Sequence, residues 1–304
     1  TMTHKKFTPL PDPLYVPLHV ERTCGENLGY LGDDTGEQIS ALNCYYSELT
    51  GFYWIWKNCH DADYVGTCHY RRYLINEKEQ IYTEKEYLEL LRKYDLVTTK
   101  KVLLNDSYYD GFLAHHNIRA LEMTGKVITE KYPEYADAFE QLVNGRQTYF
   151  GNILVTSKIL FDEYASWLFS IFFEVAERIE LETGEDAYHK RVFGFISEFL
   201  LLVWVTVKKL RVYECKVGML GEKAETGELK RCLAECFRNR DVDLAKKIFL
   251  ETREKRPDVL MEASDITGEL HLCMQIIATA GEERNHGETM ILERENDFVQ
   301  KWLR

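Results

Sequence analysis

Short apolar runs alternate along the chain with longer amphipathic segments, and this alternation limits the folds that are open to it. Residues 64–70, 94–99 and 149–156 predict strands, since aromatic, β-branched and other apolar side chains are frequent in them. Segments with helical spacing of apolar residues separate these strands. Such alternation is typical of an α/β fold, in which a mixed, mostly parallel sheet is flanked by helices.

Four segments predict helices, because their apolar residues recur every three or four positions. They span residues 40–58, 84–93, 158–182 and 187–206. Ser40 stands where a helix N-cap is expected, and a further strand is predicted at 211–216. Four of the six prolines fall within residues 9–20, which therefore predict an extended loop, and Pro133 interrupts the helices expected within 105–145.

The character of the sequence changes after Gly221. Residues 226–280 predict three short helices, with a break at Pro257. We therefore expect two domains, an α/β domain at 1–220 and a small helical C-terminal extension at 221–304. An added helical segment can mediate contacts with another protein, so the extension is a candidate site for a protein partner.

Charge and composition exclude several classes of function. The formal net charge of −12 argues against broad binding to nucleic acid, which needs an excess of basic side chains. The longest apolar run, residues 199–207, is too short to span a membrane, so any membrane contact would be peripheral. No secretory signal is recognised at the start, and the eight cysteines contain no CxxC pair. We therefore expect a cytoplasmic protein.

Cationic side chains gather where predicted strands end. His4 and Lys5 follow what we interpret as the tail of a strand that begins outside this numbering, and a second cluster follows the strand at 64–70. This cluster consists of His69, Tyr70, Arg71 and Arg72. Ligands of open α/β sheets bind beyond the carboxyl ends of strands, and arginine binds phosphate oxygens bidentately. The cluster therefore predicts a site for a polyanion such as a nucleotide diphosphate, with the segment around Asn152 also near it.

Other polar features allow more than one interpretation. Asp61 and Asp63 have the Asp-x-Asp spacing that can hold Mn²⁺ or Mg²⁺, but they precede a strand, where a metal-binding pair should follow one. We interpret them as a turn and assign no metal ligand, leaving Mn²⁺ or Mg²⁺ as an open alternative. Glu48 and Glu198 lie among apolar residues, so each is either paired with a partner or functionally tuned. Lys100, at the end of the strand at 94–99, is interpreted as an ordinary solvent-facing residue.

A set of short motifs carries a more specific signal. It comprises Thr-His-Lys at 3–5, Leu-Gly-Asp-Asp-Thr-Gly at 31–36, Tyr-Ser-Glu-Leu-Thr at 46–50, residues 53–58 and 63–66, His-Tyr-Arg-Arg-Tyr at 69–73, and residues 131–135 and 191–198. In this order they resemble a bacterial family of capsular or exopolysaccharide synthesis glycosyltransferases. The likeness covers about residues 1–217. Asp34 and Phe199 depart from it, since the family pattern has Asn and Arg near these positions.

The resemblance implies a GT-A-like fold and transfer of a sugar from a nucleotide donor to a growing surface glycan. Some relatives look like galactosyl- or galactofuranosyltransferases, so a UDP-linked hexose is the expected donor. A lipid-linked acceptor would place the protein at the inner face of the membrane. In a GT-A sheet an Asp-x-Asp motif normally ends a strand where this chain has the His69–Arg72 cluster. We hypothesise that this cluster neutralises the diphosphate leaving group in place of a metal.

The same resemblance implies roles for further residues. The predicted donor contacts are His4, Lys5, Asp33, Asp34, Thr35, Glu48, Tyr70, His116 and Asn152. Asp33, Asp34 and Thr35 would close over the nucleoside, and His116 would touch the donor phosphate or the acceptor, although a histidine in a polar loop is often only structural. The predicted catalytic residues are His69, Arg71, Arg72 and Glu198. Glu198 would act as the base for an inverting attack, or would only position the acceptor if configuration is retained.

Two other functions stay open at this stage. One is a different nucleotide-sugar reaction, such as that of a pyrophosphorylase, which a Gly-rich loop near the first strand would favour. No such loop is present in the sequence. The other is a non-catalytic module that binds a nucleotide sugar or a carbohydrate and recruits a partner through the C-terminal helices. Nucleotide binding without transfer would favour this second function.

Overall fold

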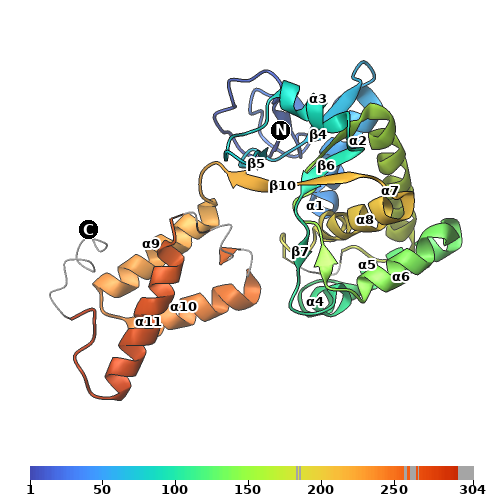
Figure 1. Ribbon diagram of the computed structural model, residues 1–304. Coiled ribbons are helices and arrows are strands. Elements are labelled where there is room, and N and C mark those ends of the chain that lie inside the picture. Colours follow the sequence, from blue (N-terminus) through green and yellow to red (C-terminus); the bar gives the residue numbers. More distant parts are fainter. Residues whose placement is uncertain (183, 185, 257–258, 261–264, 266, 294–304) are drawn as a thin grey trace. The chain divides into compact units, whose positions relative to one another are not determined.

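The chain forms two compact units, Thr1–Gly218 and Met219–Arg304 (Figure 1). The computed structural model describes residues 1–182, 184, 186–256, 259–260, 265 and 267–293. Pro257, where the sequence predicts a break, and residues 294–304 of the predicted extension lie outside the described residues.

A five-stranded sheet with the order β4-β9-β6-β10-β5 forms the centre of the first unit. Its strands are β4 (Tyr64–Thr67), β9 (Leu154–Ser157), β6 (Leu96–Thr99), β10 (Val212–Met219) and β5 (Arg72–Ile75). Strand β9 is antiparallel to both β4 and β6, whereas β6 is parallel to β10. Strands β4, β6 and β10 therefore run in one direction, and β9 runs against them.

A second, parallel sheet continues this arrangement. It consists of β1 (Met2–Thr3), β2 (Leu18–His19) and β3 (Leu31–Gly32), in that order. The segment after β4 pairs in parallel with β1: the N–H of Met2 donates to the carbonyl of Cys68 at 2.8 Å, and that of Tyr70 donates to Met2 at 3.0 Å. The carboxyl ends of β1, β2, β3, β4, β6 and β10 thus lie at one edge, as expected for a mixed, mostly parallel sheet.

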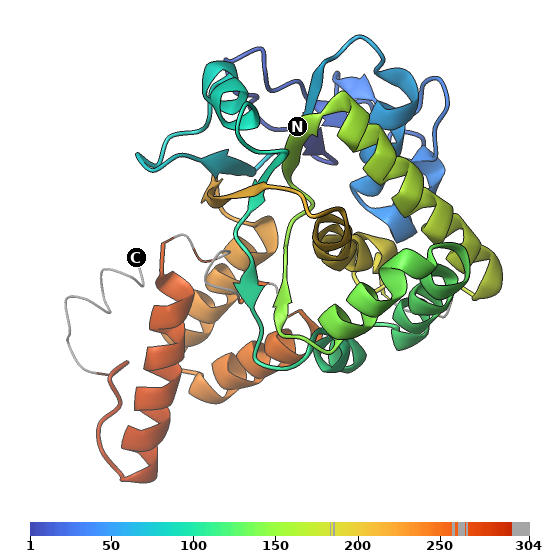
Figure 2. The same cartoon turned by 45° about the vertical axis from the view of Figure 1, so that its right-hand side comes forward.

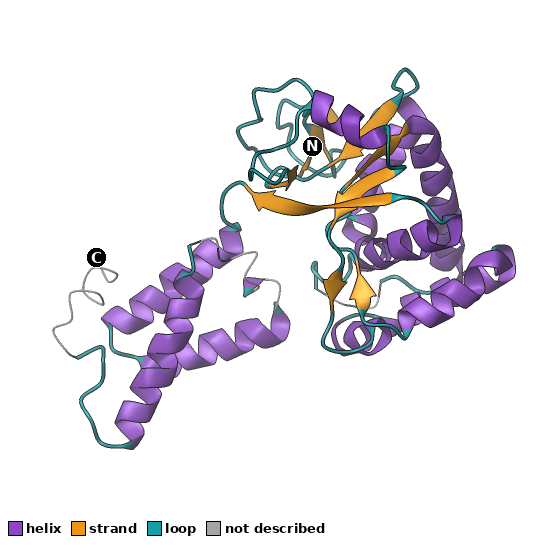
Figure 3. Cartoon of the chain, viewed as in Figure 1, coloured by secondary structure: helices purple, strands orange, loops and turns teal. Residues whose placement is uncertain are grey.

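Alternating side chains of the strands enter two separate cores. Leu96 and Leu154 join the larger core, while their neighbours Val97 and Val155 join the smaller one. This follows from the two-residue period of a strand, which directs successive side chains to opposite faces. Figure 3 shows the helices packed beside the strands.

Most helices of the first unit contribute to the larger core. They are α1 (Asn43–Tyr46), α2 (Leu49–Asn58), α4 (Tyr108–His115), α5 (Ile118–Lys131), α6 (Ala136–Val143), α7 (Lys158–Arg178) and α8 (Val192–Lys208). Helix α3 (Glu84–Leu91) contributes to the smaller core. Helices α7 and α8 lie beside each other in both views (Figures 1 and 2). Because α8 is apolar on nearly every side, it is enclosed, with Trp204 fully buried.

The helix predicted at 40–58 is interrupted in the structure. A 3₁₀ turn (Ser40–Leu42) leads into the short helix α1, and Ser47 then adopts a φ of 51° before α2 begins. Ser40 is not an N-cap, because its hydroxyl donates to Asp33 at 2.5 Å. A Cβ at Gly194 of α8 would lie 3.1 Å from the Cβ of Ser47. The chain therefore breaks where α8 approaches it, and Glu48 is left at the break.

The other predicted elements differ from the structure mainly at their ends. The strand predicted at 149–156 begins only at Leu154, and the helix predicted at 187–206 begins at Val192. The predicted interruption at Pro133 is confirmed by a 3₁₀ turn (Pro133–Tyr135) between α5 and α6. Strands β7 (Val102–Leu103) and β8 (Gln147–Thr148) form a separate antiparallel pair.

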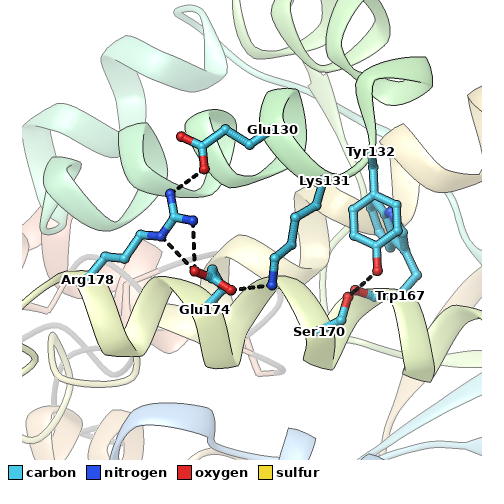
Figure 4. A network of polar contacts seen from close by, with 7 residues as sticks. All are labelled: Glu130, Lys131, Tyr132, Trp167, Ser170, Glu174 and Arg178. Atoms are coloured by element: carbon cyan, nitrogen blue, oxygen red, sulfur yellow. Dashed lines mark hydrogen bonds and ion pairs between the residues drawn. The ribbon is translucent and has the colours of Figure 1, made fainter.

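A polar network joins α5 to α7 on the side of the first unit (Figure 4). Glu174 accepts hydrogen bonds from both Lys131 and Arg178, and Arg178 also reaches Glu130 at 2.5 Å. Next to these ion pairs, the hydroxyls of Tyr132 and Ser170 are 2.5 Å apart. These contacts fix the two helices that cover the larger core.

The second unit has a core of its own. Helices α9 (Ala224–Arg238), α10 (Val242–Lys255) and α11 (Glu269–Asn285) enclose Phe237, Cys273 and other apolar side chains. Lys230 is buried and makes ion pairs with Glu222, Asp265 and Glu269, which compensate its charge. Across the described residues of both units, no helix is long and apolar enough to cross a membrane.

Two helical glycines test how tightly α2 packs on the sheet. A Cβ at Gly51 of α2 would meet Val20 at 2.9 Å and Met2 at 3.0 Å, whereas one at Gly111 of α4 would meet nothing within 4 Å. We expect Gly51→Ala to lower the free energy of unfolding by roughly 1–2 kcal/mol through overpacking. Gly111→Ala should raise it by about 0.5–1 kcal/mol through helix propensity. Thermal unfolding followed by tryptophan fluorescence would compare them, and equal melting temperatures would contradict this packing.

Candidate active site

The candidate site lies at the edge where the parallel strands end. Because β9 runs against them, its amino end lies at this same edge, and the residues just before it enter the site. These residues include Gly151, with a φ of 97°, and Asn152, with a φ of 47°. Glycine adopts positive φ without a steric penalty and asparagine tolerates it better than most residues, so the sequence suits a sharp turn here.

Both polar groups of Gly151 are bound by predicted site residues. Its N–H donates to Oε1 of Glu198, on α8, at 2.6 Å. Its carbonyl oxygen accepts a hydrogen bond from Nε2 of His69, two residues after β4, at 2.5 Å. A Cβ at this position would lie 3.9 Å from Nη1 of Arg72, so that guanidinium also lies beside the turn. One residue thus brings Glu198, His69 and Arg72 together.

The side chain of Asn152 makes the next set of contacts. Asn152 is 5% exposed, and its Nδ2 donates to Oε1 of Glu48 at 2.6 Å and to the carbonyl of Gly194 at 3.0 Å. Its Oδ1 accepts from the hydroxyl of Ser197 at 2.9 Å. Its backbone carbonyl accepts from Thr67 of β4 at 3.1 Å. Asn152 is therefore a buried residue whose hydrogen bonds link β4, α8 and Glu48.

The environment of Glu198 favours its protonated form. Burial raises the pKa of Glu198 to about 8, and the nearby carboxylate of Glu48 adds to the increase. The hydrogen bond from Gly151 and the charges of Arg72 and Arg191 oppose it. A carboxyl group with a pKa near 8 can exchange a proton close to neutral pH, which suits acid–base chemistry.

The structure corrects the charge expected at His69. Burial lowers the pKa of His69, and Arg72 acts in the same direction. Its imidazole is therefore neutral near pH 7, and its Nε2–H holds the carbonyl of Gly151. The positive charge of the cluster comes from Arg71 and Arg72, because a buried imidazole loses its charge more readily than a guanidinium.

Arg71 has hydrogen-bond donors without partners. Its Nε and Nη1 are buried and have no hydrogen-bond partner among the described residues. The guanidinium lies over the ring of Tyr70, 5.2 Å from its centroid. His4 meets the same ring edge-on at 5.8 Å, and both His4 and Lys5 are exposed. Buried guanidinium donors without partners carry a free-energy cost that an anionic ligand would remove.

The residues after β3 lie at the same edge but have different contacts. Asp33 is fully buried, and its carboxylate accepts from the hydroxyl of Ser40 and from the N–H groups of residues 21 and 22. It therefore holds its own loop and presents no free oxygen to a nucleoside. Asp34 and Thr35 are exposed, and Thr35 accepts a hydrogen bond from the indole of Trp54 at 3.0 Å. These two remain predicted donor contacts.

His116 is the C-cap of α4 and packs against α8. Its ring stacks on Phe195, three residues before Glu198 on α8, with centroids 4.2 Å apart. Burial lowers the pKa of His116 to about 3, with nearby His189 acting in the same direction, so it is neutral near pH 7. Its Nδ1 is buried without a partner among the described residues. His116 stays a predicted contact to donor or acceptor.

Other sequence features fall outside this cluster. Asp61 and Asp63 are exposed and precede β4, so they lie at the opposite end of that strand from His69. Within the described ranges, no group of three or more His, Cys, Asp or Glu side chains is arranged to hold a metal ion.

A cavity of about 400 Å³ lies along β4 and α3. It is lined mainly by apolar residues, among them Tyr15, Val65, Tyr87 and Leu91. None of the predicted catalytic or donor-binding residues lines it. We therefore base the candidate site on the polar cluster, which contains the predicted catalytic residues Glu198, His69 and Arg72.

Sequence reasoning missed four residues of the site. They are Thr67, Gly151, Arg191 and Ser197. Gly151 acts through its backbone, which no side-chain motif reveals, although the Gly-Asn pair before a strand is a turn signal. Arg191 immediately precedes α8, lies over the ring of Tyr188 at 4.6 Å and contributes positive charge near Glu198.

Comparison with known proteins gives two findings. A family model described as "Domain of unknown function (DUF4422)" matches residues 1–209. A solved structure titled "WbbM bifunctional glycosytransferase apo structure" is similar with a TM-score of 0.66 and 30% identity, over 73% of this chain and 45% of that one. No curated protein matches. The likeness to this structure confirms the GT-A-like fold that the sequence predicts, while the chain spans less than half of the length of that protein.

We expect Asn152→Asp to destabilise the first unit strongly. The new carboxylate would face Glu48 and the carbonyl of Gly194 with no proton to donate, at a cost of roughly 3 kcal/mol. Asn144→Asp is the matched control, since that amide also donates to a glutamate, Glu140, but at the exposed surface. The folded state would raise the pKa of the introduced group, so the loss should shrink as pH falls towards 5. Thermal unfolding at pH 5 and pH 8 measures both; equal losses in the two variants would contradict the buried network.

Proposed function

The chain belongs to the family described as Domain of unknown function (DUF4422), and from this premise we propose that it is a glycosyltransferase. In this proposal it moves a hexose, with galactose or galactofuranose favoured, from a UDP-sugar to a glycan acceptor of bacterial surface polysaccharide synthesis. The likeness to a bifunctional glycosyltransferase supports glycosyl transfer. The observation that carries the proposal is a pair of buried Arg71 donors at the carboxyl edge of the sheet, which have no partner in the part of the chain that the structure describes.

In the proposed donor site, the diphosphate lies against Arg71 and Arg72. Arg71 offers two unused N–H groups, and Arg72 lies beside the Gly151 turn. Exposed His4 lies against the ring of Tyr70, and exposed Lys5 follows it in the sequence; both would meet the distal part of the nucleotide. Fixed positive charge at the leaving group stabilises the transition state of transfer. The arginines would thus supply charge that Mn²⁺ or Mg²⁺ supplies in other transferases.

In the proposed transfer step, Glu198 acts as the general base. An acceptor hydroxyl attacks the anomeric carbon, its proton passes to the Glu198 carboxylate, and the bond from that carbon to the diphosphate oxygen breaks. The diphosphate leaves with the electron pair, next to the arginines. A direct displacement of this kind inverts the anomeric configuration, so NMR of the product would separate a base role from a positioning role.

The setting of the reaction also belongs to this proposal. A lipid-linked glycan acceptor would bring the protein to the inner face of the cytoplasmic membrane by peripheral contact. The helical unit at 219–304, which has its own core, would then be available to a protein partner. Nucleotide binding without any transfer would instead favour a binding module.

Glu198→Gln should lower turnover at least about a hundredfold while the protein stays folded, because the amide cannot accept the acceptor proton. Glu174→Gln is the control, since it removes a carboxylate from the same unit in the α5–α7 network. Initial rates at saturating donor, together with melting temperatures, give the comparison. Turnover within a few-fold of the unchanged protein would exclude Glu198 as the base.

A panel of nucleotide sugars, each tested with Mn²⁺ and with EDTA, tests the donor site. We expect thermal stabilisation and turnover with a UDP-hexose that persist in EDTA. Arg71→Ala should weaken nucleotide binding about tenfold to a hundredfold, since charge-assisted hydrogen bonds contribute about 1.5–3 kcal/mol. Exposed Arg119 of α5 provides the control Arg119→Ala. Strict metal dependence would contradict the arginine mechanism, and no response to any nucleotide would contradict the proposed function.

A further inference from the structure

Two carboxyl groups from distant parts of the chain meet on consecutive residues of one turn. Glu48, at the break before α2, accepts a hydrogen bond from Asn152 at 2.6 Å. Glu198, in the middle of α8, accepts one from the N–H of Gly151 at 2.6 Å. Both glutamates are half-buried. The break in the helix at Ser47 is what allows Glu48 to reach this place.

The groups that face Glu198 come from each element packed around it. The carboxylate of Glu48 disfavours its ionisation, while Arg72 of β5 and Arg191 before α8 favour it. The hydroxyls of Tyr108 on α4 and Tyr164 on α7 are near enough to interact with its charge. Burial raises the pKa of both phenols, so they stay neutral.

His69 completes this environment without adding charge. It is neutral near pH 7 and donates to the carbonyl of Gly151, whose N–H donates to Glu198. Two carboxylates held close together in a partly buried site ionise with difficulty at the same time, since like charges repel more strongly at low dielectric. The negative charge of Glu48 accordingly opposes the ionisation of Glu198.

We propose that Glu48 is a positioning residue for Glu198, and that its negative charge, held beside Glu198 through the Gly151–Asn152 turn, keeps the proton on Glu198 in the free protein. Glu48 holds the side chain of Asn152. The neighbouring residue, Gly151, donates its N–H to Glu198 and so orients that carboxyl group. The proposal rests on the proposed function, in which Glu198 receives the proton of the acceptor hydroxyl. The proton of Glu198 must leave to solvent before transfer, because only ionised Glu198 can accept another.

This pair predicts a specific pH dependence. The ratio kcat/KM should rise with pH through the pKa of Glu198, about 8. Glu48→Gln keeps an oxygen that can accept from Asn152 but removes the negative charge. The acidic limb of the kcat/KM profile should then shift to lower pH by roughly one unit, because the variant lacks the like charge near Glu198. A residue with only a structural role would change the height of the profile without moving this limb.

A direct titration separates this proposal from the proposed function. Infrared difference spectra of the free protein, without substrate, follow the loss of a protonated carboxyl band as pH rises. The band should disappear near pH 8, move to lower pH in Glu48→Gln, be absent in Glu198→Gln and be unchanged in Glu174→Gln. If the band of Glu48→Gln disappeared at the same pH as that of the unchanged protein, the proposed effect of Glu48 on Glu198 would be overturned. Absence of turnover with every nucleotide sugar would overturn the transferase function and leave this titration interpretable.

Discussion

Both backbone polar groups of Gly151, its N–H and its carbonyl, are hydrogen-bonded at the sheet edge, and the candidate site depends on this. Glu198 accepts from its N–H and His69 donates to its carbonyl, so α8 and the end of β4 are fixed to the same short turn. The turn lies there because β9 runs against its neighbours and begins where they end. A parallel β9 would have placed these residues at the opposite edge.

The fold could be predicted from sequence largely because its signals are local. Strand-like runs separated by amphipathic helices predicted the α/β class, and the motifs resembling a glycosyltransferase family predicted the GT-A-like arrangement that the structural likeness confirms. The direction of β9 is a property of pairing between distant segments, and no local pattern contains it. The break at Ser47 is similar, since it lies where Gly194 of the distant helix α8 packs closely against the chain.

The site was predicted less completely, for related reasons. Proximity to strand ends correctly grouped His69, Arg72 and Asn152, which do meet in the structure. Charge could not be predicted from residue type alone, because burial makes His69 neutral. Asp33 shows the same limitation: an acidic residue in a motif can serve its own loop when it is fully enclosed. A contact made by backbone atoms, as at Gly151, leaves almost no trace in a sequence.

The place of β10 in the sheet affects how the protein can be synthesised. Among the described strands, β10 comes last in the sequence, yet it lies inside the sheet, between β6 and β5. On the ribosome, the roughly 110 residues between β6 and β10 would take on the order of 5–20 s to appear. During that time β5 and β6 expose unpaired strand edges that can attract other chains. The first unit therefore cannot complete its central sheet until β10 emerges.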